Sequence, residues 1–289
     1  MSDFQELNLK VPKLAEANRL DQFLAEQVPL SRQRILRAIN EGGVYLNRRR
    51  CHKAGQLLQG GEDLRIVTLE NEKLHPFTPD QLVWQEAPFY LIHKRCGQYS
   101  QEALHRSQGT IPCELAIHLK MTPHQAHDLR PVHRLDRETS GLMLLCSDAA
   151  ALNKIQSLWQ THVKKEYLAV VSPAPEWDEM RIRFPISKRR DKLGRYHVDA
   201  SGRACDSEAK VLERSGDRAL IKLIPHTGRT HQLRIHLSHI GCPILGDSRY
   251  GGRKHGRLML HAHLLYVRVQ ALKNEHHWQA EPEEDWKWQ

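Results

Sequence analysis

The chain has no long hydrophobic run and no paired cysteines. None of its apolar stretches approaches the roughly 18 residues that a membrane-spanning helix needs. Its polar start, Met1-Ser2-Asp3-Phe4-Gln5-Glu6, lacks the apolar core of a signal peptide. The six cysteines are scattered without a Cys-x-x-Cys pair, which argues against a zinc knuckle and against a disulfide framework. We therefore expect a protein of the reducing cytoplasm that has no membrane partner.

Signatures of metal sites and of nucleotide cofactors are also missing. The 19 histidines include a cluster at His118, His124, His127 and His133, but no His-Glu-x-x-His pair or adjacent carboxylate set accompanies it. The apolar segments do not alternate regularly between strand and helix with phosphate-binding glycines, which argues against a doubly wound fold. The sequence predicts no metal, no cofactor, and an α+β fold with a mixed, mainly antiparallel sheet.

Positive charge is abundant and concentrated. The net charge of +9 indicates a polyanionic partner, because each neutralised phosphate releases condensed counterions, but charge alone does not distinguish RNA from DNA or an anionic membrane. The segment from Ser31 to Lys53 contains seven cationic residues and a single acidic residue, Glu41. These cations are Arg32, Arg34, Arg37, Arg48, Arg49, Arg50 and Lys53.

This basic stretch has the pattern of a folded segment. Ser31 can cap a helix that carries Ile35, Leu36 and Ile39 on one face, and Gly42-Gly43 can end it. Alternating apolar residues predict short strands at 44–46 and 64–66, and residues 20–24 predict an earlier helix. Two helices followed by a small sheet resemble the alpha-L RNA-binding module, which implies that Arg32, Arg34, Arg37 and Arg48 bind RNA. A solvated basic face on a structural subdomain is the alternative.

The composition changes near residue 75. Residues 71–82 are polar and contain Pro76 and Pro79, so they are predicted to be a linker between an RNA-binding domain at 1–70 and a larger domain at 83–272. Residues 273–289 are acidic, contain three tryptophans, and are predicted to be a loosely attached tail.

One segment of the larger domain, His133-Arg134-Leu135-Asp136-Arg137-Glu138-Thr139-Ser140-Gly141-Leu142, places a carboxylate between two arginines just before an apolar run. An isolated aspartate titrates near pH ~4, and adjacent cations favour its charged form further. An ionised carboxylate suits nucleophilic or charge-stabilising chemistry. The charge pattern alone also fits a salt-bridge turn at the entrance of a strand.

The segment resembles the H-R-L-D-x-x-T-S-G-L motif of RNA pseudouridine synthases of the large-subunit ribosomal (RluA) type. Three more of that family's motifs follow in order, so that the resemblance covers about residues 83–270. They are K-x-Y-x-A at 165–169, T-G-R-T-H-Q-L-R-x-H at 227–236 with G-x-P-I-x-G-D at 241–247, and L-H-A at 260–262. The chain departs from the family at His93-Lys94-Arg95-Cys96-Gly97, which lacks the usual proline after the lysine.

The resemblance implies roles for individual residues. Asp136 would begin the isomerisation of uridine, by covalent attack or by removing a ribose proton, and Arg234 would pair with it. Tyr167 would pack on the uracil, with its hydroxyl near carbon 5 as a proton acceptor. Arg134 would fill the place of a flipped-out uridine or clamp a phosphate, and Arg229 would contact phosphate or serve a helix cap or salt bridge.

The implied substrate is structured RNA, ribosomal or transfer, and the implied enzyme is a monomer. Two alternatives come from other functional classes. The first is a non-catalytic RNA-binding protein. The second is a nucleosidase in which Asp136 and Glu138 share one strand face at positions i and i+2.

Overall fold

The computed structural model describes residues 4–13, 18–69, 75–268, 275–283 and 285–288. The chain divides into two compact units, and the second begins at Thr78. The first unit takes in residues up to Phe77 and also Gln101–Met121, whereas residues 83–272 were predicted to form one continuous domain. The predicted linker at 71–82 lies partly outside the described residues.

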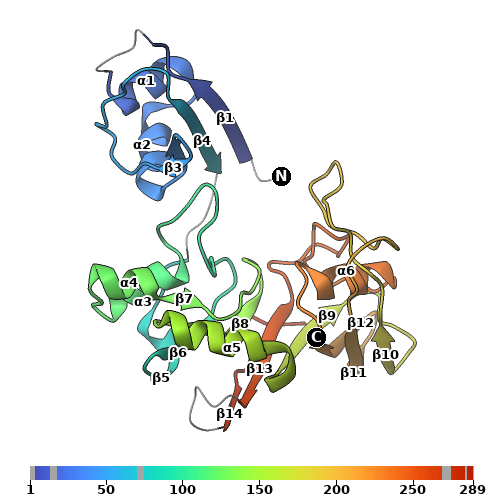
Figure 1. Cartoon of the computed structure of the whole chain (residues 1–289). Coiled ribbons are helices and arrows are strands. Elements are labelled where there is room, and N and C mark those ends of the chain that lie inside the picture. Colours follow the sequence, from blue (N-terminus) through green and yellow to red (C-terminus); the bar gives the residue numbers. More distant parts are fainter. Residues whose placement is uncertain (1–3, 14–17, 70–74, 269–274, 284, 289) are drawn as a thin grey trace. The chain divides into compact units, whose positions relative to one another are not determined.

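The first unit contains a four-stranded antiparallel sheet in the order β1-β4-β2-β3 (Figure 1). The Ser31 side chain accepts the backbone N–H of Arg34 and begins the second helix, as predicted, and Gly42 ends it in the left-handed conformation with φ of 88°. The first strand was not predicted, because its short alternation is mostly polar. The elements are β1 (Phe4–Lys10), α1 (Leu20–Gln27), α2 (Arg32–Glu41), β2 (Val44–Leu46), β3 (Arg49–Arg50), β4 (Asp63–Leu69) and α3 (Ile111–His118).

The second unit is built on a ten-stranded sheet in which eight strands follow the order β10-β11-β12-β9-β13-β8-β6-β5. All pairs are antiparallel except β8 with β13, which confirms the predicted mixed, mainly antiparallel α+β fold. The elements are η1 (Pro79–Gln81), β5 (Leu82–Glu86), β6 (Phe89–Lys94), α4 (Pro123–Asp128), β7 (Arg130–Pro131), β8 (Ser140–Cys146), α5 (Ala149–His162), β9 (Val163–Val171), β10 (Glu179–Ile182), β11 (Ser207–Ser215), β12 (Arg218–Pro225), α6 (Gln232–His239), β13 (Leu260–Arg268) and β14 (Glu275–Gln279).

Two helices cover different parts of this sheet. Helix α5 buries Ile155 and Trp159 in a core formed with β6, β8 and β13. Helix α6 buries Leu233 and Leu237 in a second core formed with β9, β12 and β13. Helix α6 begins at Gln232, directly after His231. Each such buried side chain contributes about 1.5–3 kcal/mol, so the apolar spacing seen in the sequence fixes where both helices dock.

The C-terminal segment is part of the fold, so the prediction of a loosely attached tail is wrong for residues 275–283 and 285–288. Strand β14 pairs with β13, and Trp288 is buried in the core next to α6, with Trp286 packed against it. Arg257 forms ion pairs with Glu283 and Asp285, which offset the acidic character of the segment. Aromatic burial therefore outweighs the polar composition that suggested a free tail.

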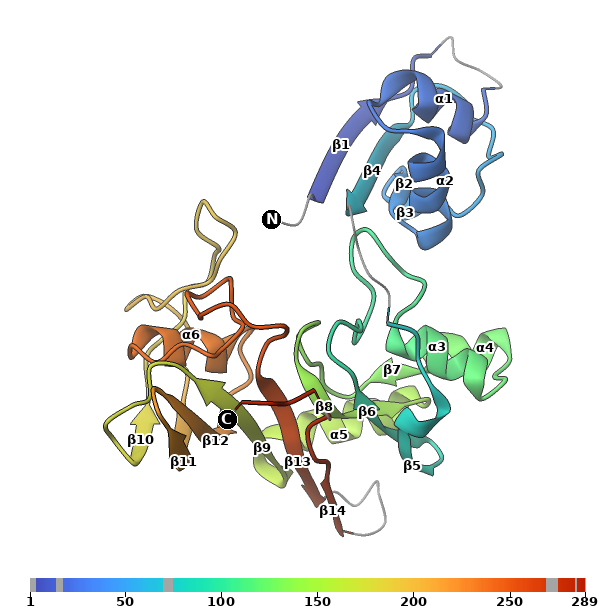
Figure 2. The ribbon, with the colours of Figure 1, turned by 180° about the vertical axis from the view of Figure 1, so that it is seen from behind.

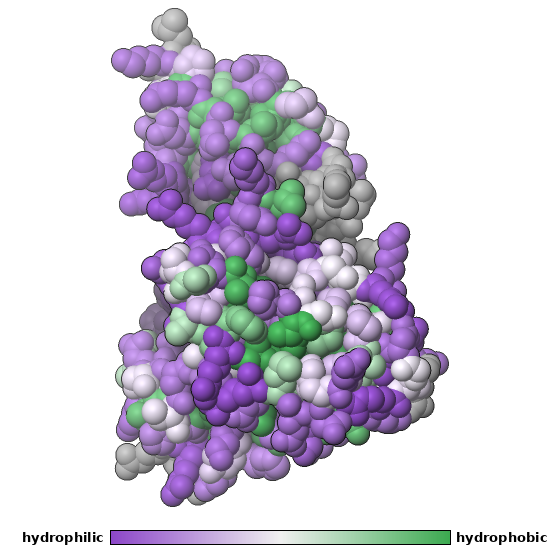
Figure 3. Space-filling view, turned by 90° about the vertical axis from the view of Figure 1, so that its right-hand side faces the viewer, coloured by the Kyte–Doolittle hydropathy of each residue, from purple (hydrophilic) through white to green (hydrophobic). Residues whose placement is uncertain are grey.

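The face of the molecule shown in Figure 3 is largely hydrophilic, with hydrophobic residues in small groups. Among the described helices, none has both the length and the apolar character required to span a membrane.

Candidate active site

Asp136 lies in a turn that joins β7 to β8. The backbone N–H of Thr139 donates to the carbonyl of Asp136 at 3.1 Å and closes this turn. Gly141 follows with φ of +113°, and a Cβ placed there would lie 2.2 Å from the carbonyl oxygen of Ala262. The glycine of the motif therefore permits the close parallel pairing of β8 with β13 that holds the turn in place.

The carboxylate of Asp136 shares a buried arginine with a second carboxylate. Arg234 on α6 donates from Nη1 to Asp136 at 3.3 Å, and from Nε and Nη2 to the two oxygens of Asp247 at 2.7 and 2.8 Å. Burial alone lowers the pKa of Arg234, but its bonds to Asp247 and Asp136 outweigh burial and raise that pKa overall. The guanidinium therefore stays charged, and its bidentate pair with Asp247 orients it toward Asp136.

Two residues of this cluster, His231 and Asp247, carried no predicted role. His231 lies with Nε2 3.7 Å from Asp136, and its Nδ1 is 2.7 Å from the hydroxyl of Tyr250. Burial lowers the pKa of His231 to about 4, so it is neutral at pH 7 and adds no charge to the site. The sequence showed His231 and Asp247 inside motifs, but their convergence on Arg234 and Asp136 depends on the fold.

A cavity of about 500 Å³ opens beside this cluster. Its volume lies within the range of small-molecule binding pockets, about 300–1,000 Å³. Asp136, Tyr167 and Arg234 all line it. Its other walls come from the motif turn, α5, β9, β13 and the segment before α6, and include Val132, His133, Arg134, Gln156, Trp159, Lys165, Thr227, Arg229, His231 and Leu260.

Tyr167 is a residue of β9, the strand that pairs with β12 on one side and with β13 on the other. Burial, and to a smaller extent the charge of Asp136, raises the pKa of its hydroxyl, so the phenol stays protonated at neutral pH. This favours a flat, neutral packing surface over a phenolate base. Arg134 and Arg229 also line the cavity, and both are exposed to solvent.

Of the four histidines that lie close together in the sequence, His133 lines the cavity. His133 stacks on Trp159 with ring centroids 4.8 Å apart, and its Nε2 accepts the backbone N–H of Leu144. Burial, with a smaller contribution from Lys165, lowers the pKa of His133 to about 3. In the described parts of the chain, no group of three or more His, Cys, Asp or Glu side chains is placed to hold a metal ion.

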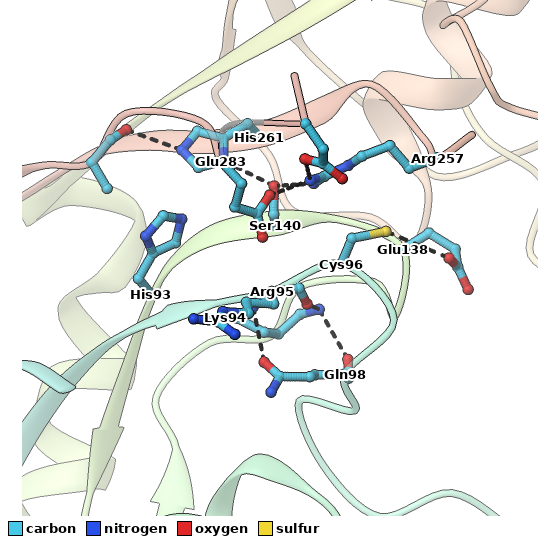
Figure 4. A network of polar contacts seen from close by, with 12 residues as sticks. His93, Lys94, Arg95, Cys96, Gln98, Glu138, Ser140, Arg257, His261 and Glu283 are labelled. Carbon is cyan, nitrogen blue, oxygen red and sulfur yellow. Dashed lines mark hydrogen bonds and ion pairs between the residues drawn. The ribbon is translucent and has the colours of Figure 1, made fainter. Parts of the chain in front are cut away.

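A buried lysine, Lys94, supports the motif turn through hydrogen bonds to backbone carbonyls (Figure 4). Lys94 donates to the carbonyls of Arg95, Gln98 and Arg137, the last at 2.9 Å. Burial lowers its pKa to about 8. Lys94 therefore connects the loop at 93–97, which lacks the family's proline, to Arg137, the residue after Asp136.

A second polar chain connects the other end of the turn to the C-terminal segment (Figure 4). Arg257 donates to the hydroxyl of Ser140 at 2.7 Å, and that oxygen is 2.9 Å from Nδ1 of His261. Nε2 of His261 is 3.0 Å from the carbonyl of Ala280. Burial lowers the pKa of His261 to about 3, so the neutral ring accepts from Ser140 and donates to Ala280.

The carboxylate arrangement expected for a nucleosidase is wrong. Residues 136–139 form a turn rather than a strand, so Asp136 and Glu138 do not share a strand face. Glu138 instead forms an ion pair with Arg137 at 3.7 Å and lies 3.7 Å from the Cys96 sulfur.

The arginines predicted to bind RNA differ in their surroundings. Arg32 and Arg48 are exposed in the first unit. Arg34 donates to Thr68, and Arg37 forms an ion pair with Glu41, both at 3.0 Å. Arg50, counted in the basic stretch, donates to the carbonyls of Gly42, Ala103 and Leu104 and so holds the unit together.

The second unit has a basic loop that was not among the segments predicted to bind RNA. It lies between β10 and β11 and projects near α6 (Figures 1 and 2). Lys188, Arg189, Arg190 and Lys192 are exposed on it. Asp191 accepts the backbone N–H groups of Leu193 and Arg195, which rigidifies the tip. Five cations in eight residues were visible in the sequence, but only the fold places this loop in the same unit as Asp136.

Comparison with known protein families gives two matches. The model described as "RNA pseudouridylate synthase" matches residues 88–239. The model described as "S4 domain" matches residues 18–64, which confirms the predicted N-terminal RNA-binding module.

Individual proteins agree with these matches. An uncharacterized RNA pseudouridine synthase of Aquifex aeolicus is 32% identical, covering 82% of this chain and 78% of that protein. The ribosomal large subunit pseudouridine synthase C of Escherichia coli K12 is 29% identical, covering 89% and 85%. The solved structure of human RNA Pseudouridylate Synthase Domain Containing 1 is similar with a TM-score of 0.60 and 25% identity, covering 72% of this chain and 86% of that one.

Proposed function

Because this chain belongs to the RNA pseudouridylate synthase family, we propose that Asp136 starts the conversion of uridine to pseudouridine and that the substrate is ribosomal RNA. One observation carries the role of Asp136. Its carboxylate lies 3.3 Å from a permanently charged arginine at the wall of a cavity of about 500 Å³.

The reaction needs an ionised carboxylate. The bond between ribose C1′ and uracil N1 must break, the base must turn in place, and C5 must bond to C1′ before C5 loses its proton. Asp136 can begin this by attacking covalently or by removing a ribose proton, and both routes need it ionised. Uridine and pseudouridine are isomers, so the sequence of steps balances without an oxidant or a second substrate.

Arg234 maintains that ionised state in our proposal. A carboxylate that is covered by substrate loses water, which favours its protonated form, and a nearby cation opposes this effect. Asp247 holds Arg234 through two hydrogen bonds, so the guanidinium is already oriented before RNA arrives. The neutral His231 leaves Arg234 as the charged partner of Asp136 in the described cluster.

Tyr167 holds the detached base. Stacking of a nucleobase on an aromatic ring contributes roughly 1–3 kcal/mol, enough to keep uracil in the cavity while it turns. The target must leave its helix or lie in a loop, because a paired base hides its glycosidic bond. The exposed Arg134 at the cavity is the residue that takes the vacated place in the RNA or clamps a phosphate.

A non-catalytic RNA-binding protein fits the site less well. Such a protein has no use for a buried guanidinium shared by Asp136 and Asp247, since buried ion pairs cost desolvation and are weak sources of stability. In an enzyme whose Asp136 reacts, the shared guanidinium of Arg234 keeps that carboxylate ionised.

The choice of ribosomal RNA rests on the named relatives and on the N-terminal module. Several relatives at 29% identity are called ribosomal large subunit pseudouridine synthase C. The exposed Arg32 and Arg48 supply phosphate contacts, with Arg34 and Arg37 on the same helix. The cavity is lined by one unit of a single chain, which supports action as a monomer, and the cytoplasm is where we place this reaction.

Mapping pseudouridines in total RNA from cells with and without the gene tests the substrate. We expect loss of one or a few pseudouridines in ribosomal RNA, restored by the wild-type gene and not by Asp136→Asn. Loss at transfer RNA positions alone would overturn the ribosomal assignment, and restoration by Asp136→Asn would overturn the role of Asp136.

A further inference from the structure

Lys165 is a cation in the cavity that the chemistry above does not use. It projects from β9 with its Nζ 5.9 Å from the ring centroid of Trp159, and it lines the same cavity as Asp136. The side chain is partly buried. Within the described residues it forms no ion pair and no hydrogen bond, in contrast to Arg234 and Lys94.

Apart from the Trp159 ring, the Lys165 ammonium has no partner among the described residues. A cation without an anionic or hydrogen-bonding partner is costly at a partly buried position, because burial removes the water that stabilises its charge. Burial lowers the pKa of Lys165 to about 8, so the amine is still charged at pH 7. The adjacent His133 is neutral and supplies no negative charge to Lys165. An anion that arrives with the substrate would therefore stabilise the charge of Lys165.

We propose that Lys165 forms a subsite for a backbone phosphate flanking the target uridine. This inference rests on the proposed function, since it takes the ligand of the cavity to be RNA. Lys165 and Tyr167 are two residues apart on the same face of β9, about 7 Å along the strand. A nucleotide places its flanking phosphates at a comparable distance from its base, so uracil on Tyr167 brings a phosphate to Lys165.

Burial distinguishes Lys165 from the exposed cations of the cavity. Arg134 and Arg229 are exposed, where water and salt weaken their attraction for phosphate. Gln156, on the same wall, already donates to the carbonyl of Val132. A phosphate at Lys165 meets a less hydrated cation, and the interaction is correspondingly stronger.

The test pairs a change in the protein with a change in the RNA. The probe is a short hairpin carrying the mapped uridine, with an uncharged methylphosphonate at either its 5′ or its 3′ phosphate. The nucleoside before the altered linkage carries a 2′-methoxy group, and the reference RNA has the same sugar with an ordinary phosphate. Dissociation constants are measured at one salt concentration with full-length Asp136→Asn protein, with and without Lys165→Met.

At one of the two linkages, we expect the methylphosphonate to weaken binding roughly 10- to 100-fold, as for a lost charged hydrogen bond. Lys165→Met should weaken binding of the reference RNA by a similar factor, and the two changes together should be no worse than either alone. Lys165→Arg should retain sensitivity to the linkage. The control Lys164→Met, at the exposed neighbouring position on β9, should behave like the parent protein.

Additive losses at both linkages, or unchanged binding by Lys165→Met, would overturn the phosphate subsite. Unfolding measurements separate a loss of phosphate binding from a folding defect. Replacing Lys165, which has no ion-pair partner among the described residues, by methionine should not lower the melting temperature at pH 7. Isomerisation of unmodified RNA by the wild-type protein is measured in parallel. Absence of that activity defeats the proposed function, whereas its presence with additive losses defeats only the subsite.

Discussion

At the scale of single residues, the site depends on how one guanidinium is divided between two carboxylates. Asp247 is fully buried and holds Arg234 with two short hydrogen bonds, while Asp136 has one longer bond and faces the cavity. The shorter, bidentate pair with Asp247 fixes the arginine, and the longer single bond leaves the Asp136 carboxylate able to change partners. Removing Asp247 should therefore damage both stability and catalysis.

We expect Asp247→Asn to lower the free energy of unfolding by about 3 kcal/mol, the low end for breaking a buried pair, because Arg234 keeps Asp136 as a partner. Urea unfolding measures this change, and isomerisation rates should fall as Arg234 loses its orientation. The control Asp217→Asn breaks an exposed pair with Arg253 and should cost less than about 1 kcal/mol. Equal effects of the two substitutions would contradict the account.

The pKa of Lys165 gives a pH prediction. Since this pKa is lowered to about 8, the charge of Lys165 is lost as pH rises through 8, while phosphate stays anionic. The value of kcat/KM, which reports the free enzyme, should fall above pH 8. In Lys165→Arg the charge persists and the fall should disappear. A fall of the same size in both proteins would assign the titration to another group, such as Lys94.

The residues of the site could be predicted from sequence to different extents. Asp136, Tyr167 and Arg234 were identified because they occupy fixed places in motifs. Asp247 was visible in a motif without a role, because its pairing with Arg234 requires the segment after α6 to fold back. Lys165 was likewise seen only as the first residue of its motif, since the absence of a partner is a property of the folded cavity.

At the scale of elements, two segments outside the motifs complete the second unit. The basic loop between β10 and β11 has its base next to the site. Tyr196 and Val198 pack with Ile235, the neighbour of Arg234 on α6. The loop that carries the exposed cations therefore also packs against the helix that bears Arg234.

Substituting Lys188, Arg189 and Lys192 together by alanine should weaken RNA binding and flatten its salt dependence. Each lost phosphate contact reduces the slope of log K against log salt by roughly 0.7 to 0.9, the values for single strands and for B-form duplexes. Titrations at several salt concentrations measure the slope. Lys210→Ala, which removes an exposed cation paired with Glu179, is the control. An unchanged slope in the triple variant would show that the loop does not contact RNA.

The C-terminal segment is the second such element, and Trp288 tests its attachment. Trp288→Ala should lower the free energy of unfolding by about 3 kcal/mol, because a buried indole leaves a cavity in the core near α6. Leu193→Ala, at an exposed position of the basic loop, should change stability by less than about 0.5 kcal/mol. A variant at Trp288 as stable as the wild type would restore the original prediction of a loose tail.

At the scale of the whole molecule, the fold class and the presence of two functional parts could be read from apolar periodicity, basic clustering and motifs. The assignment of Gln101–Met121 to the first unit could not, because it depends on contacts such as those of Arg50 with the carbonyls of Ala103 and Leu104. Pairing of β14 with β13 was missed for the same reason. Long-range contacts of this kind leave no local pattern in the sequence.

The central claim is that the ionised carboxylate of Asp136 isomerises uridine within RNA. RNA transcribed with uridine tritiated at carbon 5 tests it most directly, because forming the new bond at C5 releases that hydrogen to water. The account predicts tritium release by the wild-type protein and none above background by a folded Asp136→Asn variant. Equal release by both proteins, or release by neither from any ribosomal or transfer RNA, would contradict it.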